Sequence, residues 1–108
     1  QGQARLVKPR LAMYQKGKLT SRAEAESGLI ETRTHEIELS TRVVVRSADD
    51  DSTLRTESLL YSPARGKIYT EQAVEVDRAD GHMSGQGLEA TPDLKEIRIK
   101  KQRTVITK

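Results

Sequence analysis

Few side chains in this sequence are of the kinds that perform catalysis or hold metal ions. The two histidines, His35 and His82, stand 47 positions apart, each beside charged or turn-forming residues. The chain has no cysteine, which excludes disulfides, thiol nucleophiles and zinc-thiolate centres. No Gly-x-Ser-x-Gly motif is present to place a serine nucleophile. We therefore predict surface histidines, no metal site, no cofactor and no enzymatic activity.

Two further motifs resemble ligand-binding sequences but lack the context that binding requires. Asp49-Asp50-Asp51 offers carboxylates, yet an oxygen cage for a cation also needs ligands at defined later positions and usually a turn glycine. We expect a solvated hairpin loop there. The segment 85–90, Gly-Gln-Gly-Leu-Glu-Ala, partly matches a dinucleotide fingerprint, but a helix must follow that motif. Thr91-Pro92-Asp93 follows instead, and nucleotide binding is not expected.

Length and composition describe one small domain with a mixed surface. The chain has 108 residues, 34% of them hydrophobic, and its 19 Lys and Arg against 16 Asp and Glu give a net charge of +3. That length holds one core at most. The small basic surplus permits an anionic partner without demanding one. No run approaches the roughly 18 apolar residues of a membrane span, and the start at Gln1 without a leader is expected for a domain trimmed from a longer protein.

Alternation with a period of two predicts that strands position these residues. It is strongest between residues 37 and 46, where one face carries Ile37, Leu39, Thr41, Val43 and Val45. The other face carries charged or hydroxyl side chains, with Val44 as the exception. Turn-forming residues recur about every 8 to 15 positions, as in antiparallel sheets. No segment has a helical apolar stripe. The predicted strands cover residues 4–8, 10–16, 18–26, 35–46, 53–61, 66–77, 82–89 and 95–107.

The central part of the chain carries a family resemblance. It lies in the run Leu-Arg-Thr-Glu-Ser-Leu-Leu-Tyr at 54–61, Pro63 and Gly66, Ile-Tyr-Thr at 68–70, Val74, and the glycine-containing segment 85–90. Met-Tyr-Gln-Lys-Gly at 13–17 and Arg-Ala-Glu-Ala at 22–25 match the expected first hairpin. These residues resemble the LptC family, the bridge proteins of bacterial lipopolysaccharide transport. The usual aromatic residue after the first turn is absent, with Leu19 and Ser21 in that region.

The resemblance implies an all-β fold, an open twisted antiparallel β-jellyroll of the OstA-like type, with residues 1–108 forming a single periplasmic domain. It also implies an inner-membrane anchor outside this sequence and no catalysis. Such a protein receives lipopolysaccharide from an ATP-driven inner-membrane complex and passes it to a periplasmic jellyroll protein. Acyl chains would lie in an apolar slot lined by the inward faces of the strands, with these candidate residues: Val43, Val45, Leu54, Ile68, Val74, Val76, Met83, Ile97 and Ile99.

Partner docking is expected at the sheet edges, since an unpaired strand offers main-chain hydrogen bonds to another strand. The resemblance implies that the first strands face the inner-membrane ABC transporter complex and that the last strand faces an LptA-type periplasmic jellyroll. An edge-to-edge homodimer is the open alternative. The candidate docking residues of the last strand are Lys95, Ile97, Ile99, Arg103 and Val105.

Three alternatives remain open at the level of sequence. Gly85 and Gly87 either permit a bulge or leave room for an acyl chain. The basic residues from Arg98 to Lys108 either form an ordinary solvated strand face or bind lipid A phosphates, nucleic acid or an acidic partner. A small basic OB-like β-barrel would bind nucleic acid, but such barrels use aromatic stacking platforms. With three scattered tyrosines as its only aromatic residues, the chain is not expected to bind nucleic acid.

Overall fold

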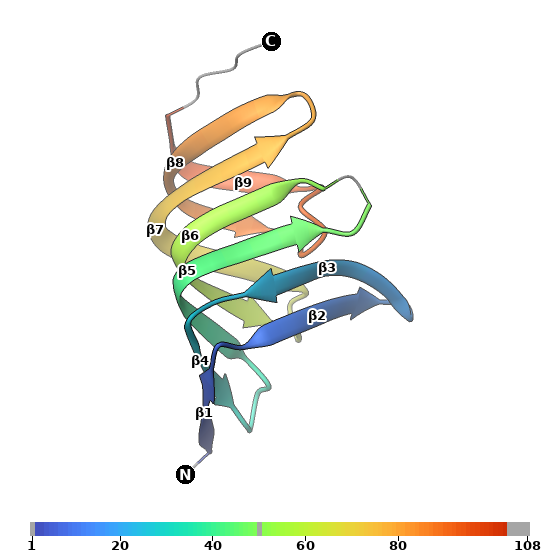
Figure 1. Cartoon of the computed structure of the whole chain (residues 1–108), viewed down its shortest axis with the longest axis vertical. Coiled ribbons are helices and arrows are strands. Elements are labelled where there is room, and N and C mark those ends of the chain that lie inside the picture. Colours follow the sequence, from blue (N-terminus) through green and yellow to red (C-terminus); the bar gives the residue numbers. More distant parts are fainter. Residues whose placement is uncertain (1, 50, 104–108) are drawn as a thin grey trace.

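The computed structural model describes residues 2–49 and 51–103, and in these residues it contains β-strands and no helix (Figure 1). No described segment therefore provides a helix long and apolar enough to cross a membrane. The all-β prediction is confirmed. The strands are β1 (Gln3–Val7), β2 (Arg10–Gln15), β3 (Lys18–Glu24), β4 (Ser27–Glu31), β5 (Ile37–Ser47), β6 (Thr53–Ser62), β7 (Lys67–Arg78), β8 (Gly81–Ala90) and β9 (Ile97–Arg103).

All pairings are antiparallel within one open sheet, whose main order is β1-β4-β5-β6-β7-β8-β9. The β2–β3 hairpin joins this sheet separately. The first half of β5, from Ile37 to Ser40, pairs with β4, whereas its second half, from Val44 to Ser47, pairs with β3. One long strand thus belongs to two layers, and the sheet rolls over into an open jellyroll (Figure 1). The predicted architecture is confirmed.

The two layers meet where the long strands bend. The pairing shifts between Ser40 and Val43 in β5, and at the facing positions of β6 and β7. In β5 the bend uses Thr41 and Arg42, with φ of 68° and 54°. In β8 it uses Gly87, with φ of 80°. Bulges of this kind add a residue to one strand and increase its bend and twist, so the four strands turn together.

The inward faces of both layers form one hydrophobic core. In one layer a cross-strand row runs through Ala23, Val45, Leu54, Val76 and Met83. In the other layer a row runs through Ile30, Ile37, Tyr61, Ile68, Ala90 and Ile97. These residues belong to or pack against the core, apart from Ile30, which is half-buried between Ile37 and Ala4. The alternation seen in the sequence therefore identifies the buried faces.

The prediction that residues 27–34 connect two strands was wrong, because β4 lies within that segment. Its sequence, Ser-Gly-Leu-Ile-Glu, has little alternation, and glycine weakens strand propensity. β4 is nevertheless hydrogen-bonded on both sides, to β1 and to β5. Gly28 is buried there, and a Cβ built on it would stand 3.0 Å from Pro9 Cγ and 3.3 Å from the Glu38 carbonyl oxygen. The formation of β4 therefore depends on tertiary packing and is not predicted by its local sequence.

The last strand also begins later than predicted, at Ile97 in place of position 95. Residues 91–96 form a turn in which Asp93 Oδ1 accepts hydrogen bonds from Thr91 Oγ1 at 2.6 Å and from the Lys95 amide at 3.0 Å. The Thr91 amide closes the turn by donating to the Glu96 carbonyl oxygen at 2.9 Å. Side chains that bind the backbone locally favour turns over strands. Positions 104–107 of the predicted strand lie outside the described residues.

Candidate functional site

The structure brings the predicted slot residues together on the inner faces of the two layers. Six of them are buried: Val43, Val45, Leu54, Ile68, Val74 and Val76. Met83, Ile97 and Ile99 are partly buried and pack against these six. Aliphatic side chains of this kind offer alkyl chains a matching surface, without polar groups that would be left unpaired.

Sequence reasoning left out several residues that complete this interior. Leu39 and Leu59 lie opposite each other in the β5–β6 ladder and are buried. Leu88 is buried opposite Ile99. A bend reverses the alternation, so that Thr56 and Leu59, three positions apart, are both buried. The apolar positions of 59 and 88 were visible in the sequence, but the reversal that turns them inward depends on the pairing of strands.

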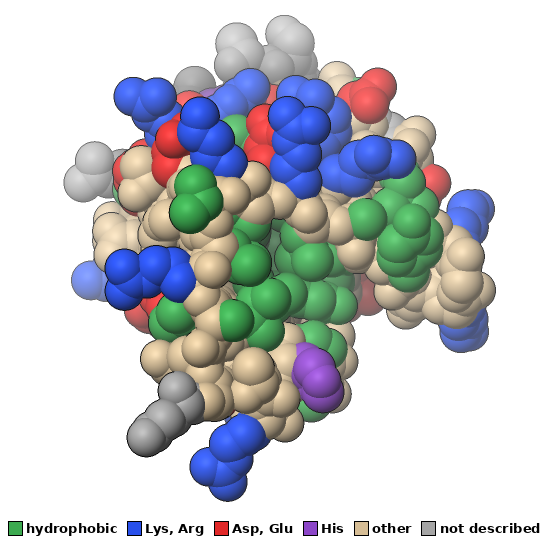
Figure 2. Space-filling model, turned by 60° about the horizontal axis from the view of Figure 1, so that its bottom comes forward, with side chains coloured by type: hydrophobic (Ala, Val, Ile, Leu, Met, Phe, Trp, Pro, Cys, Tyr) green, Lys and Arg blue, Asp and Glu red, His purple; other side chains and the backbone are tan. Residues whose placement is uncertain are grey.

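The interior approaches the surface at the end of the molecule where β1, β2 and β4 lie (Figure 1). In a view turned so that this end comes forward, hydrophobic side chains gather around a hollow (Figure 2). The inward row of the second layer reaches this end through Ile37 and Ile30, which are half-buried, and continues to the exposed Ala4 on β1. This end therefore exposes apolar surface that continues into the core.

The inner face of the other layer ends in hydroxyl groups. Ser21 and Ser47 lie opposite each other on β3 and β5, and both are buried. Ser47 Oγ accepts a hydrogen bond from the Asp49 amide at 3.3 Å. Ser21 Oγ has no hydrogen-bond partner among the described residues. The aliphatic part of the interior is thus bounded by a short polar segment next to the β5–β6 turn.

The two glycines of β8 have different roles. Gly87 is buried at the bend, and a Cβ on it would stand 3.0 Å from Lys100 Cδ and 3.3 Å from Lys100 Cβ. Its positive φ and this close approach favour the bulge interpretation at Gly87. Gly85 lies opposite the inward-facing Val74 and contributes no side chain to the inner face at its own position. The interpretation as space for a lipid stays a prediction, at Gly85.

The docking residues predicted for the last strand lie in different environments. Lys95 lies in the preceding turn, and its Nζ is 3.2 Å from Asp49 Oδ2 in the β5–β6 loop. Ile97 and Ile99 point inward, and the backbone of Arg103 pairs with Ser84. Val105 lies outside the described residues. Among the described strands β9 pairs only with β8, so its other edge remains open to an added strand.

The opposite end of the sheet also has open edges. Within the described part of the chain, β1 pairs only with β4 and β2 only with β3. The large apolar side chains with most exposure lie on these two strands, Val7 at 83% and Tyr14 at 62%. The structure therefore offers strand edges at both ends of the sheet.

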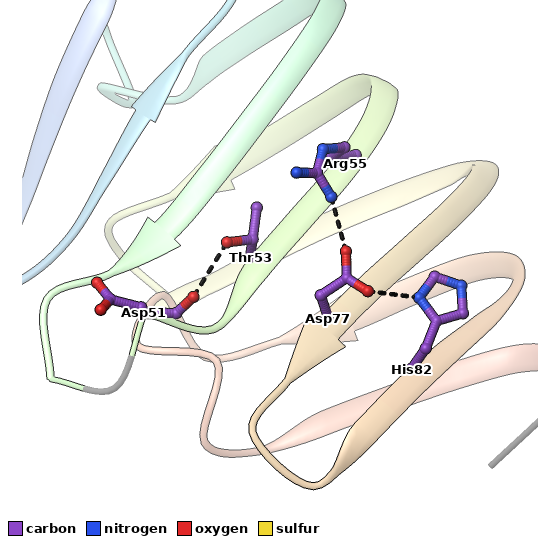
Figure 3. A network of polar contacts seen from close by, with 5 residues as sticks. All are labelled: Asp51, Thr53, Arg55, Asp77 and His82. Atoms are coloured by element: carbon purple, nitrogen blue, oxygen red, sulfur yellow. Dashed lines mark hydrogen bonds and ion pairs between the residues drawn. The ribbon is translucent and has the colours of Figure 1, made fainter. Parts of the chain in front are cut away.

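Charged residues occupy the outer face. Asp77 on β7 binds two neighbours, Arg55 Nη1 at 2.7 Å and His82 Nδ1 at 2.6 Å (Figure 3). The hydrogen bond to His82, followed by the one from Arg55, holds the pKa of the Asp77 carboxyl below its ordinary value. Lys100 of the basic terminal segment pairs with Glu71. His35 is exposed in the turn after β4. No cluster of three or more potential metal ligands occurs among the described residues.

The chain is similar to a known protein family. The family model described as "Lipopolysaccharide-assembly, LptC-related" matches residues 1–107, essentially the whole chain. No curated protein matches the chain.

Proposed function

Since this chain belongs to the LptC family of lipopolysaccharide-assembly proteins, we propose that it holds the acyl chains of lipopolysaccharide in its apolar interior and passes the lipid onward. The family acts in lipopolysaccharide transport as periplasmic domains and not as enzymes. The observation that carries the proposal is an aliphatic interior that reaches the surface at one end of the rolled sheet. Each buried methylene contributes about 0.8 kcal/mol, so even part of an acyl chain would bind appreciably.

The bends suggest how a packed interior could admit a lipid. β5, β6, β7 and β8 each run through both layers, and their bends lie at facing positions. The layers can therefore separate by bending along this line, without breaking hydrogen bonds between neighbouring strands. Opening then costs mainly apolar contacts across the core, and an entering acyl chain restores contacts of the same kind. No energy source is needed within this domain, since the carrier step is passive.

The open edges support a bridging role. We propose that β1 and β2 face the inner-membrane ABC transporter complex and that β9 pairs with an LptA-type jellyroll. A strand added to either edge would extend the sheet through main-chain hydrogen bonds. The proposed membrane anchor would lie outside this sequence. Homodimerisation would use the same edges and would therefore compete with both partners.

The nucleic-acid alternative has little support from the fold. An OB-fold is a five-stranded, partly open barrel that stacks bases on clustered aromatic side chains. Here the described strands form one open sheet, with Tyr14 on β2, Tyr61 on β6 and Tyr69 on β7. Tyr61 points into the core and Tyr14 lies at the β2–β3 hairpin, so these rings do not form one platform.

Photo-crosslinking tests the proposed slot. A benzophenone side chain at Met83 should capture lipopolysaccharide, because Met83 is partly buried and faces inward beside Val76. The same probe at Glu75 should not, because Glu75 is exposed and neighbours on a strand point to opposite faces. Val76 itself is fully buried, so a bulky probe there would overpack the core.

The outcomes separate a carrier from a closed core. Capture at Met83 with little at Glu75 supports the slot. Equal capture at both positions, or none at Met83 while circular dichroism shows a folded domain, would contradict it. A Val76→Asp variant gives a second measurement. It should weaken lipid binding more than Glu75→Lys, because a buried carboxylate must be desolvated or must bring water into the slot.

A further inference from the structure

A groove of about 580 Å³ lies on β2, β3, β5 and the β5–β6 turn. Three arginines line it, Arg10, Arg22 and Arg46, together with the carboxylates Glu24 and Asp51. All five are exposed. The volume is within the range of small-molecule sites, roughly 300–1,000 Å³. We propose that this groove binds a phosphate monoester, and that Arg22 and Arg46 hold the phosphate.

The pairing of the strands brings these two guanidinium groups together. Arg22 on β3 lies directly opposite Arg46 on β5. Side chains in such pairs have Cβ atoms about 4.5–5.5 Å apart, and like charges placed this way destabilise a sheet. An anion bound between them would convert this repulsion into two charge-assisted interactions.

The acidic residues nearby have other positions or partners. Glu24 lies opposite Arg10 and so is placed to balance that arginine. The cross-strand row that contains Arg22 and Arg46 continues through Thr53 to Asp77. Both carboxylate oxygens of Asp77 already have partners, one in Arg55 and one in His82 (Figure 3). Neither Arg22 nor Arg46 forms an ion pair within the described residues. Of the two carboxylates that line the groove, only Asp51 remains to balance the two positive charges of Arg22 and Arg46.

A phosphate monoester fits this pair better than a carboxylate does. It carries a charge of about −1.5 to −2 at pH 7 and three terminal oxygens, enough for two guanidinium forks at once. A carboxylate has one charge and two oxygens, which a single fork satisfies. Beside the pair, Ala12 lies opposite Arg22 and Val44 opposite Glu24, so the groove also has a small apolar floor. This proposal does not depend on the acyl slot, because the exposed Arg22 and Arg46 side chains carry it and neither belongs to the hydrophobic core.

Titration of the whole domain with inorganic phosphate tests the site. Nuclear magnetic resonance of the arginine Nε–Hε groups should show saturable shifts at Arg22 and Arg46, with sulfate at equal ionic strength as a comparison anion. Binding should be stronger at pH 7.5 than at pH 5.5, because a larger fraction of inorganic phosphate carries its second negative charge at the higher pH. Arg22→Gln and Arg46→Gln should each weaken binding roughly tenfold, the effect of losing one charge-assisted pair. Arg33→Gln is the matched control, since Arg33 is exposed in the β4–β5 turn outside the groove.

Folding and geometry have separate controls. Each Gln variant should melt no lower than the parent protein, because it removes a like-charge pair. Arg46→Lys keeps the charge but loses the fork, and should bind phosphate more weakly than the parent while remaining folded.

Vesicles distinguish the source of the phosphate. Phosphatidic acid in phosphatidylcholine vesicles presents a monoester, whereas twice as much phosphatidylglycerol presents diesters of similar total charge. Preference for phosphatidic acid identifies a lipid headgroup as an acceptable ligand, and binding of inorganic phosphate alone identifies a soluble one. An equal loss of binding in Arg33→Gln, or binding to both vesicles without saturable phosphate shifts, would overturn the proposal, because either would indicate general attraction of anions to a basic surface.

Discussion

Leu59 and Leu60 offer a sharp test of the layered interior, because they are the same residue on opposite faces of one strand. Leu59 is 2% exposed and lies opposite Leu39 in the core. Leu60 is partly exposed and lies between Glu38 and Tyr69 on the outer face. Replacing each by alanine removes the same atoms from two different environments.

The structure predicts unequal costs. A buried Leu→Ala change costs about 2–5 kcal/mol, because it removes transfer free energy and leaves a cavity. At Leu60 part of the side chain already contacts water, so we expect about 1 kcal/mol or less. A domain of this size has a total stability of about 5–15 kcal/mol. A difference of about 2 kcal/mol between the variants corresponds to roughly 10 °C in melting temperature.

Urea unfolding followed by far-ultraviolet circular dichroism measures this difference. The slope of free energy against urea should be the same in both variants, so that the shift in midpoint reports stability alone. Equal destabilisation by Leu59→Ala and Leu60→Ala, or a larger effect at Leu60, would refute the assignment of faces beyond the bend in β6. A one-residue slip in pairing would produce that reversed result.

Other predictions follow from single positions. Gly28→Ala should lower stability by about 1–3 kcal/mol, because its Cβ would stand 3.3 Å from the Glu38 carbonyl oxygen; unchanged urea stability would contradict the tight packing of β4. Ser21→Ala should raise stability by about 1 kcal/mol, because it removes a buried hydroxyl without a partner among the described residues. A loss of stability would contradict this expectation, because it would mean that the Ser21 hydroxyl forms a stabilising hydrogen bond in the folded protein. Asp77 has a lowered pKa, so its carboxylate stabilises the folded state above the ordinary Asp pKa of about 3.9, and this contribution is lost as pH falls through the lower folded value. Asp77→Asn should therefore unfold more easily than the parent at pH 7 but not in strong acid, whereas Asp80→Asn in the adjacent turn should show no such change.

Alternation and turn residues were sufficient to predict most strands and their buried faces. Val43 and Val45 were assigned to one face from period two, and both are buried. Val44 broke the alternation in the sequence and is half-buried on the outer face. The buried faces are predictable because a strand with one buried face must place apolar residues at every second position.

The remaining features depend on contacts between distant segments. β4 forms because β1 and β5 supply its hydrogen bonds, a condition that its own five residues do not encode. The bends reverse the alternation within β6, and bends of this kind are fixed by pairing and not by local composition. The Arg22–Arg46 pair could not be predicted either, since 24 positions separate the two residues and only the β3–β5 pairing brings them together.

The succession of hairpins from β5 to β9 has a consequence for the way the domain opens. From β5 to β9 each strand is hydrogen-bonded to the strand that follows it in sequence. Such an array behaves like a one-dimensional chain of nearest-neighbour couplings, as repeat proteins do. Detaching β6 breaks two couplings, whereas detaching β9 breaks only the one with β8. Amide protons should therefore exchange with solvent faster toward the β9 end, and β9 is the strand that an incoming strand could replace at the lowest free-energy cost.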